Sequence, residues 1–218
     1  MMDRLTRRGL TRALSVGLLL SLGCADARTR ALDGLHGVQL SPARPKPDFT
    51  LTDTDGRPFD FRNATAGRAT LLYFGYTNCV DVCPVTMANI AAAMKTLSAN
   101  QQARIQVIFV TTDPARDTPQ RLRAWLNNFD PHFIGLSGDT GDINRIEASL
   151  GLPASSAEPM PSMPASDTGA RSQSYEVGHA AQVLGFSPDD SLRVEFTSGF
   201  SRADWENDLP KLLEIHGG

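Results

Sequence analysis

The chain has 218 residues, of which 41% are hydrophobic, and a formal net charge of −3. This length and composition suffice for one substantial hydrophobic core, so we expect a single folded domain. Without residues 1–27 the chain keeps 17 basic and 22 acidic residues, a net charge of −5, which argues against the basic surface that nucleic-acid binding requires.

The N-terminus has the pattern of an export signal. Four arginines within the first 12 residues precede an apolar run at residues 13–23, as the charged and apolar regions of a secretory signal do. The run is too short to cross a bilayer as a helix, which needs about 20 residues. Residues 6–10, with the pair Arg7-Arg8, also resemble a twin-arginine export signal. We therefore predict that residues 1–27 are a signal and that the mature domain is periplasmic.

Two ways of processing this signal remain open. The motif Leu-Gly-Cys that ends at Cys24 resembles a lipoprotein box, although Ser21 stands where leucine is usual, and a lipid on Cys24 would attach the protein to a membrane. Residues 25–27, Ala-Asp-Ala, instead offer the small-x-small pattern of ordinary cleavage. In either case the mature fold keeps only Cys79 and Cys83, too few cysteines for a disulfide scaffold.

The next segments are extended. Residues 28–46 mix Arg, Gly and Pro with few apolar residues and predict a tether without a core element. Residues 48–51 and 58–61 flank a turn and predict a short N-terminal hairpin at the front of the domain. Residues 69–76 are apolar on both alternating faces, as in a central strand of a covered sheet.

A strand–helix–strand unit follows. Apolar residues recur at helical spacing from residue 84 to about residue 99, which predicts an amphipathic helix with Pro84 in its first turn. Residues 104–111 predict a second buried strand, and the unit implies a right-handed crossover between parallel strands. Thr118 and Pro119 then have the pattern of a helix N-cap followed by proline at the first helical position.

The C-terminal half begins with a strand, a helix and a loop. Residues 133–136 predict a short strand, and a helix begins at Asp139 or Thr140 and ends near Gly151. Residues 153–174 carry four prolines among Ser, Met, Ala, Asp and Gly, without apolar periodicity. We expect a long loop there.

A strand hairpin and a helix close the chain. Residues 181–186 and 192–197 predict two strands joined by a turn, and residues 202–215 predict a helix that Pro210 should kink or restart. The order of elements predicts an α/β domain with a mixed central sheet. Two cysteines at the start of its first long helix favour a thioredoxin-like arrangement.

Cys79 and Cys83 lie where the central strand is followed by this helix. A helix N-terminus favours thiolates through its dipole and free N–H groups. Positions i and i+4 share one helix face, so both sulfurs can point at one atom between them. This favours chelation of a soft metal, Cu(I) or zinc, with room for a third ligand. The same spacing also permits a disulfide, either redox-active or merely structural.

A histidine is the best candidate for the third ligand. His36 lies in the predicted tether, His132 in a loop and His216 in the tail, and we expect all three at the surface. His179 stands at the end of the long loop, before a strand, where it can reach a helix N-terminus. From spacing alone, His179 is either a ligand or an ordinary loop histidine.

Four separated motifs resemble the Sco/SenC family, and the resemblance covers residues 47–218. It implies a thioredoxin-like three-layer domain that binds copper, as Cu(I) or Cu(II), through Cys79, Cys83 and His179. The motifs are Phe-Gly-Tyr-Thr-Asn-Cys-Val-Asp-Val-Cys-Pro at 74–84, Asp-Pro-Ala-Arg-Asp-Thr-Pro at 113–119, Phe-Ile-Gly-Leu-Ser-Gly at 133–138 and Tyr-Glu-Val-Gly-His at 175–179.

The resemblance also implies a function. Members of this family help to assemble the binuclear copper site of cytochrome c oxidase, by handing over copper, by reducing the cysteines of that site, or both. The expected partners are the copper-bearing subunit of the oxidase and other periplasmic copper carriers. Because an oxidised dithiol cannot ligate copper, redox state and metal loading would be coupled. A metal-independent thiol-disulfide oxidoreductase and a thioredoxin-superfamily peroxidase are the alternatives.

The sequence departs from the family pattern at two positions. Val80 replaces the proline usual after the first cysteine, which should loosen the backbone without removing a ligand. Gly178 replaces the aspartate usual before the histidine, and that carboxylate would orient the imidazole or tune its basicity. Met160 and Met163 in the long loop are either additional Cu(I) ligands or ordinary loop residues.

Acidic and basic side chains also lie near the two cysteines in the sequence. Asp81 stands between the cysteines and either contacts the site or a partner, or is only solvated. Asp113 and Arg116 are expected to make structural turn contacts close to the site, and Asp117 is expected to be a turn residue.

Overall fold

The computed structural model describes residues 34–159 and 175–215. Its strands are β1 (Val38–Pro45), β2 (Thr50–Asp53), β3 (Pro58–Asp60), β4 (Ala69–Gly75), β5 (Ile105–Thr111), β6 (Ile134–Ser137), β7 (Ser156–Pro159), β8 (Tyr175–Gly178), β9 (Val183–Ser187) and β10 (Ser191–Phe196). Its helices are α2 (Phe61–Ala64), α3 (Val82–Met94), α4 (Ala99–Ala103), α5 (Pro119–Leu126), α6 (Thr140–Ser149) and α7 (Arg202–Glu214). The predicted front hairpin is β2 and β3.

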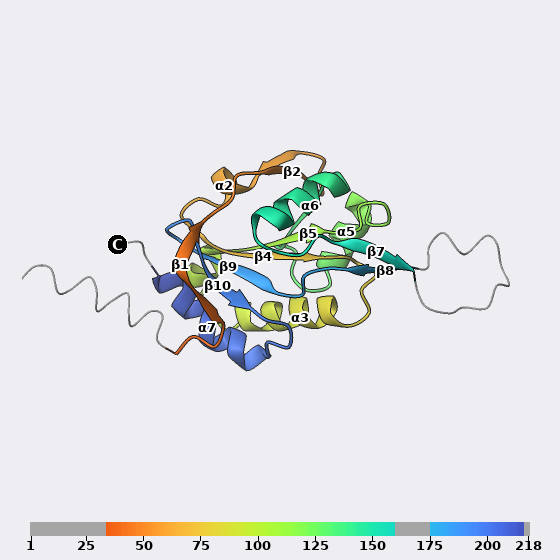
Figure 1. Cartoon of the computed structure of the whole chain (residues 1–218). Helices are drawn as coiled ribbons and strands as arrows, with labels where there is room; N and C mark the ends of the chain where they lie inside the picture. The colour runs from red at the N-terminus through yellow and green to blue at the C-terminus, as the bar shows by residue number, and fades with distance from the viewer. Residues whose placement is uncertain (1–33, 160–174, 216–218) are drawn as a thin grey trace, which may run out of the picture.

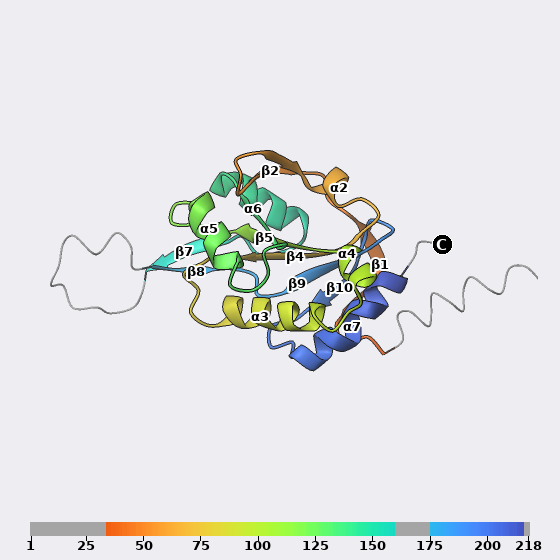
Figure 2. The same cartoon turned by 180° about the vertical axis from the view of Figure 1, so that it is seen from behind.

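A mixed sheet of eight strands organises the described part of the chain, in the order β1-β10-β9-β4-β5-β6-β2-β3. β4 pairs in parallel with β5 and antiparallel with β9, so it is a central strand, as predicted from its sequence. Helices α3 and α7 cover one face of the sheet and α6 covers the other (Figures 1 and 2). The domain therefore has the predicted three-layer, thioredoxin-like α/β fold.

Side chains of β4 enter hydrophobic cores on both sides of the sheet, because successive residues of a strand point to opposite faces. Tyr73 lies in the same core as Met87 of α3 and Trp205 of α7, whereas Phe74 lies in the core that includes Ile143 of α6. Every residue of β4 is buried. The C-terminal end of β4 is thus a fixed point, and the two cysteines follow directly after it.

The predicted tether contains a strand. β1 pairs antiparallel with β10 at one edge of the sheet, so the expectation that residues 28–46 hold no core element was wrong for this strand. Most β1 side chains are exposed or half-buried. An edge strand therefore shows little apolar alternation, and an edge also tolerates prolines. Buried Asp208 of α7 accepts the backbone N–H groups of His36 and Gly37 just before the strand.

The predicted loop at residues 153–174 begins with a strand. β7 pairs antiparallel with β8 outside the main sheet, and we call this pair the β7–β8 ribbon. Its two strands have four residues each, too few to show a clear alternation in the sequence. The signal at 1–27, Cys24, Met160, Met163 and His216 lie outside the described residues.

The helices also differ from their predictions in places. α7 continues through Pro210, and the buried leucines on both sides of this proline hold the helix against the core. The short helices α2 and α4 were not predicted, because four or five residues are too few to show a helical period. No helix in the described residues combines the length and the apolar character needed to span a membrane.

Candidate metal centre

The turn after β4 carries both cysteines, and we call residues 76–83 the cysteine loop. Cys79 lies within the turn and is half-buried, whereas Cys83 lies in the first turn of α3 and is fully buried. Both are free thiols. Gly75 leaves room for the second sulfur, because a Cβ at this position would lie 2.8 Å from Cys83 Sγ. The strand end and the helix start thus fix the spacing of the two sulfurs.

A buried carboxylate from the next crossover holds the cysteine loop. Asp117, only 1% exposed, accepts the N–H of Thr77 at 2.9 Å and the hydroxyl of Thr111 at 2.6 Å. It also accepts the hydroxyl of Thr77, and Arg121 donates to that same hydroxyl oxygen at 2.9 Å. Asp117 lies in the predicted turn, since its N–H donates to the Asp113 carbonyl oxygen, but its side chain also holds the cysteine loop. The sequence gave no indication of this side-chain role, because its partners lie in other segments: Thr111 is on β5 and Thr77 follows the end of β4.

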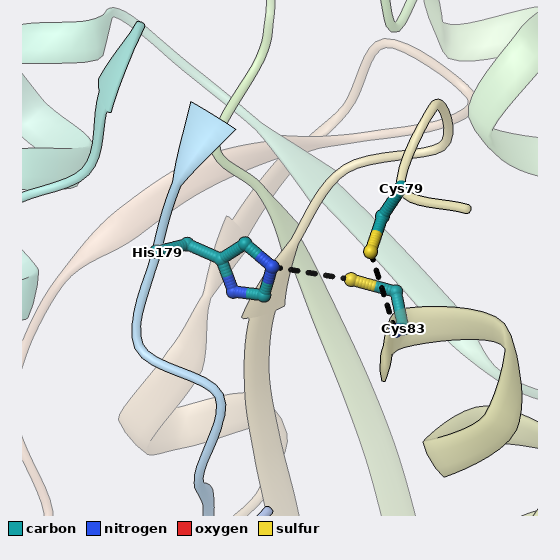
Figure 3. Close-up of side chains that lie close together, drawn as sticks. All are labelled: Cys79, Cys83 and His179. Carbon is teal, nitrogen blue, oxygen red and sulfur yellow. Dashed lines mark hydrogen bonds between the residues drawn. The ribbon is translucent and has the colours of Figure 1, made fainter. Parts of the chain in front are cut away.

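His179 follows β8 and points at the two sulfurs (Figure 3). Its Nδ1 lies 3.0 Å from the carbonyl oxygen of Ala180, so Nδ1–H donates there and Nε2 faces the cysteines. The Nε2 atom lies 3.4 Å from Cys83 Sγ. The ring packs edge-on against Tyr73 and Tyr76, with centroid distances of 6.2 and 5.6 Å. These contacts orient the imidazole although Gly178 offers no carboxylate.

The two thiols differ in charge. A hydrogen bond from the Cys83 thiol lowers the pKa of Cys79 to about 3, against the effect of burial and with help from His179 and the N–H groups of Cys83 and Asp81. The pKa of Cys83 is raised, because this thiol donates to the Cys79 thiolate and is buried. The Tyr73 hydroxyl lies 3.6 Å from Cys83 Sγ. At neutral pH the pair therefore holds one thiolate and one thiol.

The imidazole responds to the same charge. Burial by itself lowers the pKa of His179, but its hydrogen bonds to Cys79 and to the Ala180 carbonyl raise it above the usual value. The Cys79 thiolate therefore favours a positive charge on the imidazole, and the same thiolate would attract a metal cation. This electrostatic setting favours a bound cation.

The donor set suits a soft metal ion. The ligand atoms of Cys79, Cys83 and His179 all lie within 4.8 Å of one another. Two cysteine sulfurs with one imidazole nitrogen match the preferences of Cu(I) and of zinc. Within the described residues, no other group of three such side chains lies close enough to hold an ion. His36 and His132 lie elsewhere, next to Asp204 and Asp130 respectively.

Other residues of the sequence motifs surround the site. Val80 is 90% exposed, and the exposed Asp81 caps α3 without a side-chain hydrogen bond to the helix. Asp113 and Arg116 make the expected local turn contacts, a backbone hydrogen bond and an ion pair. Arg116 also stacks on Tyr175 of β8, with the guanidinium 3.5 Å from the ring centroid. The sequence did not identify Tyr73 and Tyr76 as neighbours of His179, because strand alternation alone does not show which core residue touches the site.

The fold and the site define a class: a thioredoxin-like domain with two cysteines four residues apart at a helix start and a histidine directly after a later strand. The SCO1/SenC family profile matches residues 38–214, and the chain belongs to this family. A Stutzerimonas stutzeri protein that is named for copper binding is 32% identical over 202 residues, covering 90% of this chain and 93% of that protein.

Solved structures agree with this assignment. Apo Sco1 from Thermus thermophilus matches with a TM-score of 0.68 at 28% identity, and the match covers 81% of this chain and 96% of that one. Bradyrhizobium japonicum ScoI, solved with copper bound, matches with a TM-score of 0.63 at 28% identity, covering 78% of this chain and 99% of that one.

Proposed function

We propose that this protein binds copper through Cys79, Cys83 and His179 and helps to assemble the binuclear copper site of cytochrome c oxidase. The observation that carries the proposal is the convergence of two sulfurs and a correctly oriented imidazole nitrogen within 4.8 Å. Soft sulfur ligands select Cu(I), and the imidazole adds a donor that Cu(II) also accepts. Membership of the SCO1/SenC family supports the choice of copper over zinc.

The proposal includes a location and partners. Residues 1–27 act as an export signal, and the domain works in the periplasm, either attached to the membrane by a lipid on Cys24 or released by ordinary cleavage. The partner that receives copper or electrons is the copper-bearing subunit of the oxidase, and other periplasmic copper carriers supply the metal. The mass of the mature N-terminus, measured on protein from the periplasm, distinguishes the two processing routes.

Anaerobic Cu(I) titration of the reduced protein tests the copper site. We expect one equivalent to bind tightly, and a Cys79→Ser, Cys83→Ser double variant to lose this binding because it lacks both thiolates. His179→Ala should alter the charge-transfer absorption of the Cu(II) form. His132→Ala is the matched control, because His132 is exposed and lies away from the site. Equal Cu(I) affinity in the cysteine variant would contradict the proposal.

A second function is favoured by the unequal thiols. The half-buried Cys79 thiolate can attack a disulfide of a partner and form a mixed disulfide. This first step releases one partner sulfur as a thiolate, which can take the proton of Cys83. Cys83 then attacks the Cys79 sulfur and releases the second partner sulfur, which leaves a Cys79–Cys83 disulfide and two reduced cysteines on the partner. This reaction serves the same assembly if the partner is the oxidase copper site, and it needs no metal.

The two functions are separated by His179, which disulfide exchange does not require. His179→Ala should abolish oxidase maturation in cells if copper ligation is essential, while the dithiol reduction potential and exchange rates stay near the wild-type values. If the variant instead supports normal maturation, the metal-independent reductase function is the better description.

A further inference from the structure

The β7–β8 ribbon, which leads to His179, has few backbone ties to the rest of the domain. Its strands pair only with each other among the described strands, and the ribbon extends past the end of the main sheet (Figure 1). Contacts outside the sheet must therefore set the position of the histidine that follows β8.

One such contact comes from α6. Glu147 is fully buried, and its two carboxylate oxygens accept the N–H of Ser155 at 2.8 Å and the hydroxyl of Ser155 at 2.6 Å. Ser155 directly precedes β7, and Ser156 pairs with Gly178 of β8. His179 is the next residue. Glu147 of α6 is thus connected to the imidazole through its hydrogen bonds to Ser155 and through the pairing of β7 with β8.

The hydrogen bonds to Ser155 do not by themselves explain why a carboxylate is buried at position 147. A glutamine of nearly the same size could keep both contacts with Ser155, because its carbonyl oxygen accepts the N–H and its amide donates to the hydroxyl oxygen. A buried carboxylate costs free energy, and burial raises the pKa of Glu147. The charge of Glu147 also acts on the imidazole of His179 and is the smallest of the causes that raise its pKa. Gly178, next to the histidine, has no side chain to provide such a carboxylate.

We propose that Glu147 is a positioning residue that holds His179 towards the two cysteines and favours the imidazole as a ligand of the bound cation. This inference rests on the proposed copper site but concerns only its third ligand. Two thiolates suffice for Cu(I), so the positioning by Glu147 matters mainly when the site holds Cu(II), which binds imidazole well.

The variant Glu147→Gln tests the role of the charge. We expect one equivalent of Cu(I) to bind as in the wild type. The thiolate-to-Cu(II) charge-transfer absorption should shift towards that of His179→Ala, and Cu(II) affinity should fall about tenfold, as when an outer partner of a ligand is removed. An unchanged absorption and affinity would overturn the proposal.

A double-variant cycle separates positioning from a general loss of structure. In the His179→Ala background, Glu147→Gln should cause no further loss of Cu(II) affinity, because the residue acts through the imidazole. The same tenfold loss in both backgrounds would show that Glu147 acts through the fold, and would overturn the proposal. Asp142→Asn removes an exposed carboxylate from the same helix and should leave every measurement unchanged.

The metal-free protein gives an independent measurement. The ring nitrogen NMR signals of His179 should shift in Glu147→Gln and in Ser155→Ala, which keeps the charge but removes the hydroxyl donor, and should stay in place in Asp142→Asn. If Glu147→Gln does not fold, the His179 ring signals in Ser155→Ala test the positioning role instead. Unchanged ring signals would overturn the positioning role. If the wild type binds no copper, the proposed function fails, whereas these signals still test Glu147.

Discussion

The cysteine loop carries two of the three ligand candidates, and the third, His179, directly follows the β7–β8 ribbon; the loop and the ribbon are held in different ways. The loop joins the central strand β4 to α3, and the buried Asp117 fixes it from the segment between β5 and α5. The ribbon lies outside the main sheet, and the side-chain contacts of Glu147 and Arg116 tie it to the domain.

This difference has a consequence for the site. The two sulfurs are fixed before any metal binds, because moving them requires the core around β4 to change. We expect the imidazole to be easier to withdraw than the sulfurs, by opening of the ribbon, since local opening draws on the regions with the fewest buried contacts. Two fixed ligands and one adjustable ligand would allow the proposed copper site both to hold and to release its metal.

The largest predicted effect is a loss of stability when the support of the cysteine loop is removed. Asp117→Ala leaves the N–H of Thr77 and two threonine hydroxyls without their buried acceptor, so we expect the free energy of unfolding to fall by about 3 kcal/mol. Urea unfolding measures this loss. Asp55→Ala, which removes an exposed carboxylate, is the control and should leave stability unchanged. A loss as small as that of the control would show that Asp117 does not hold the loop.

The charge difference between the thiols can be measured by alkylation. The folded pKa of Cys79 is about 3, below its ordinary value of 9.0, so its thiolate persists as pH falls from 8 to 5. We expect iodoacetamide at pH 5 to modify Cys79 at least about a hundredfold faster than the buried, protonated Cys83. Mass spectrometry of the two peptides gives the rates. Similar rates at both cysteines would contradict this assignment.

The same shift predicts a pH dependence of stability. Because the folded pKa of Cys79 is lowered, its contribution to stability is fully present above pH 9 and is lost progressively as pH falls towards 3. Because the pKa of Cys83 is raised, this residue lowers stability only as pH rises above 9. Wild type should therefore lose more stability than Cys79→Ser between pH 8 and 5, as measured by urea unfolding. Equal losses would argue against a folded-state thiolate.

The close approach of Gly75 to Cys83 gives a sharper test of how rigid the loop is. A methyl group in Gly75→Ala would lie 2.8 Å from Cys83 Sγ and 3.0 Å from the Phe109 ring, so we expect a stability loss of about 2 kcal/mol and weaker Cu(I) binding. Gly141→Ala is the matched control, because a Cβ there meets nothing within 4 Å. If both variants bind Cu(I) equally, the position of the second sulfur is less constrained than we infer.

The smallest effect should come from loosening the ribbon at its outer end. The Tyr175 hydroxyl donates to Asp113 at 2.6 Å, and Tyr175→Phe removes this bond at a cost of about 1 kcal/mol. Hydrogen exchange should become about fivefold faster in β7 and β8 and should not change in α3. Exchange that increases equally in α3 would show that the ribbon does not open separately from the rest of the domain.

The prediction of the site from sequence succeeded where the signals were local. The apolar run of β4, the helical period of α3 and the spacing of Cys79 and Cys83 each lie within one short segment, so they could be interpreted without knowledge of the fold. The strand β1 and both strands of the ribbon were missed, because their pairing partners lie far away in the chain and their own alternation is weak.

The sequence by itself determined a central strand followed by a helix with two thiols at its start, together with a family pattern that singled out His179. Only the tertiary structure decided which nitrogen of His179 faces the sulfurs, which thiol carries the charge and which carboxylates support the site. The physical reason is that periodicity and helix-start chemistry act within a few residues. The partners of Asp117 and Glu147, and the neighbours of the imidazole, are set by packing between distant segments.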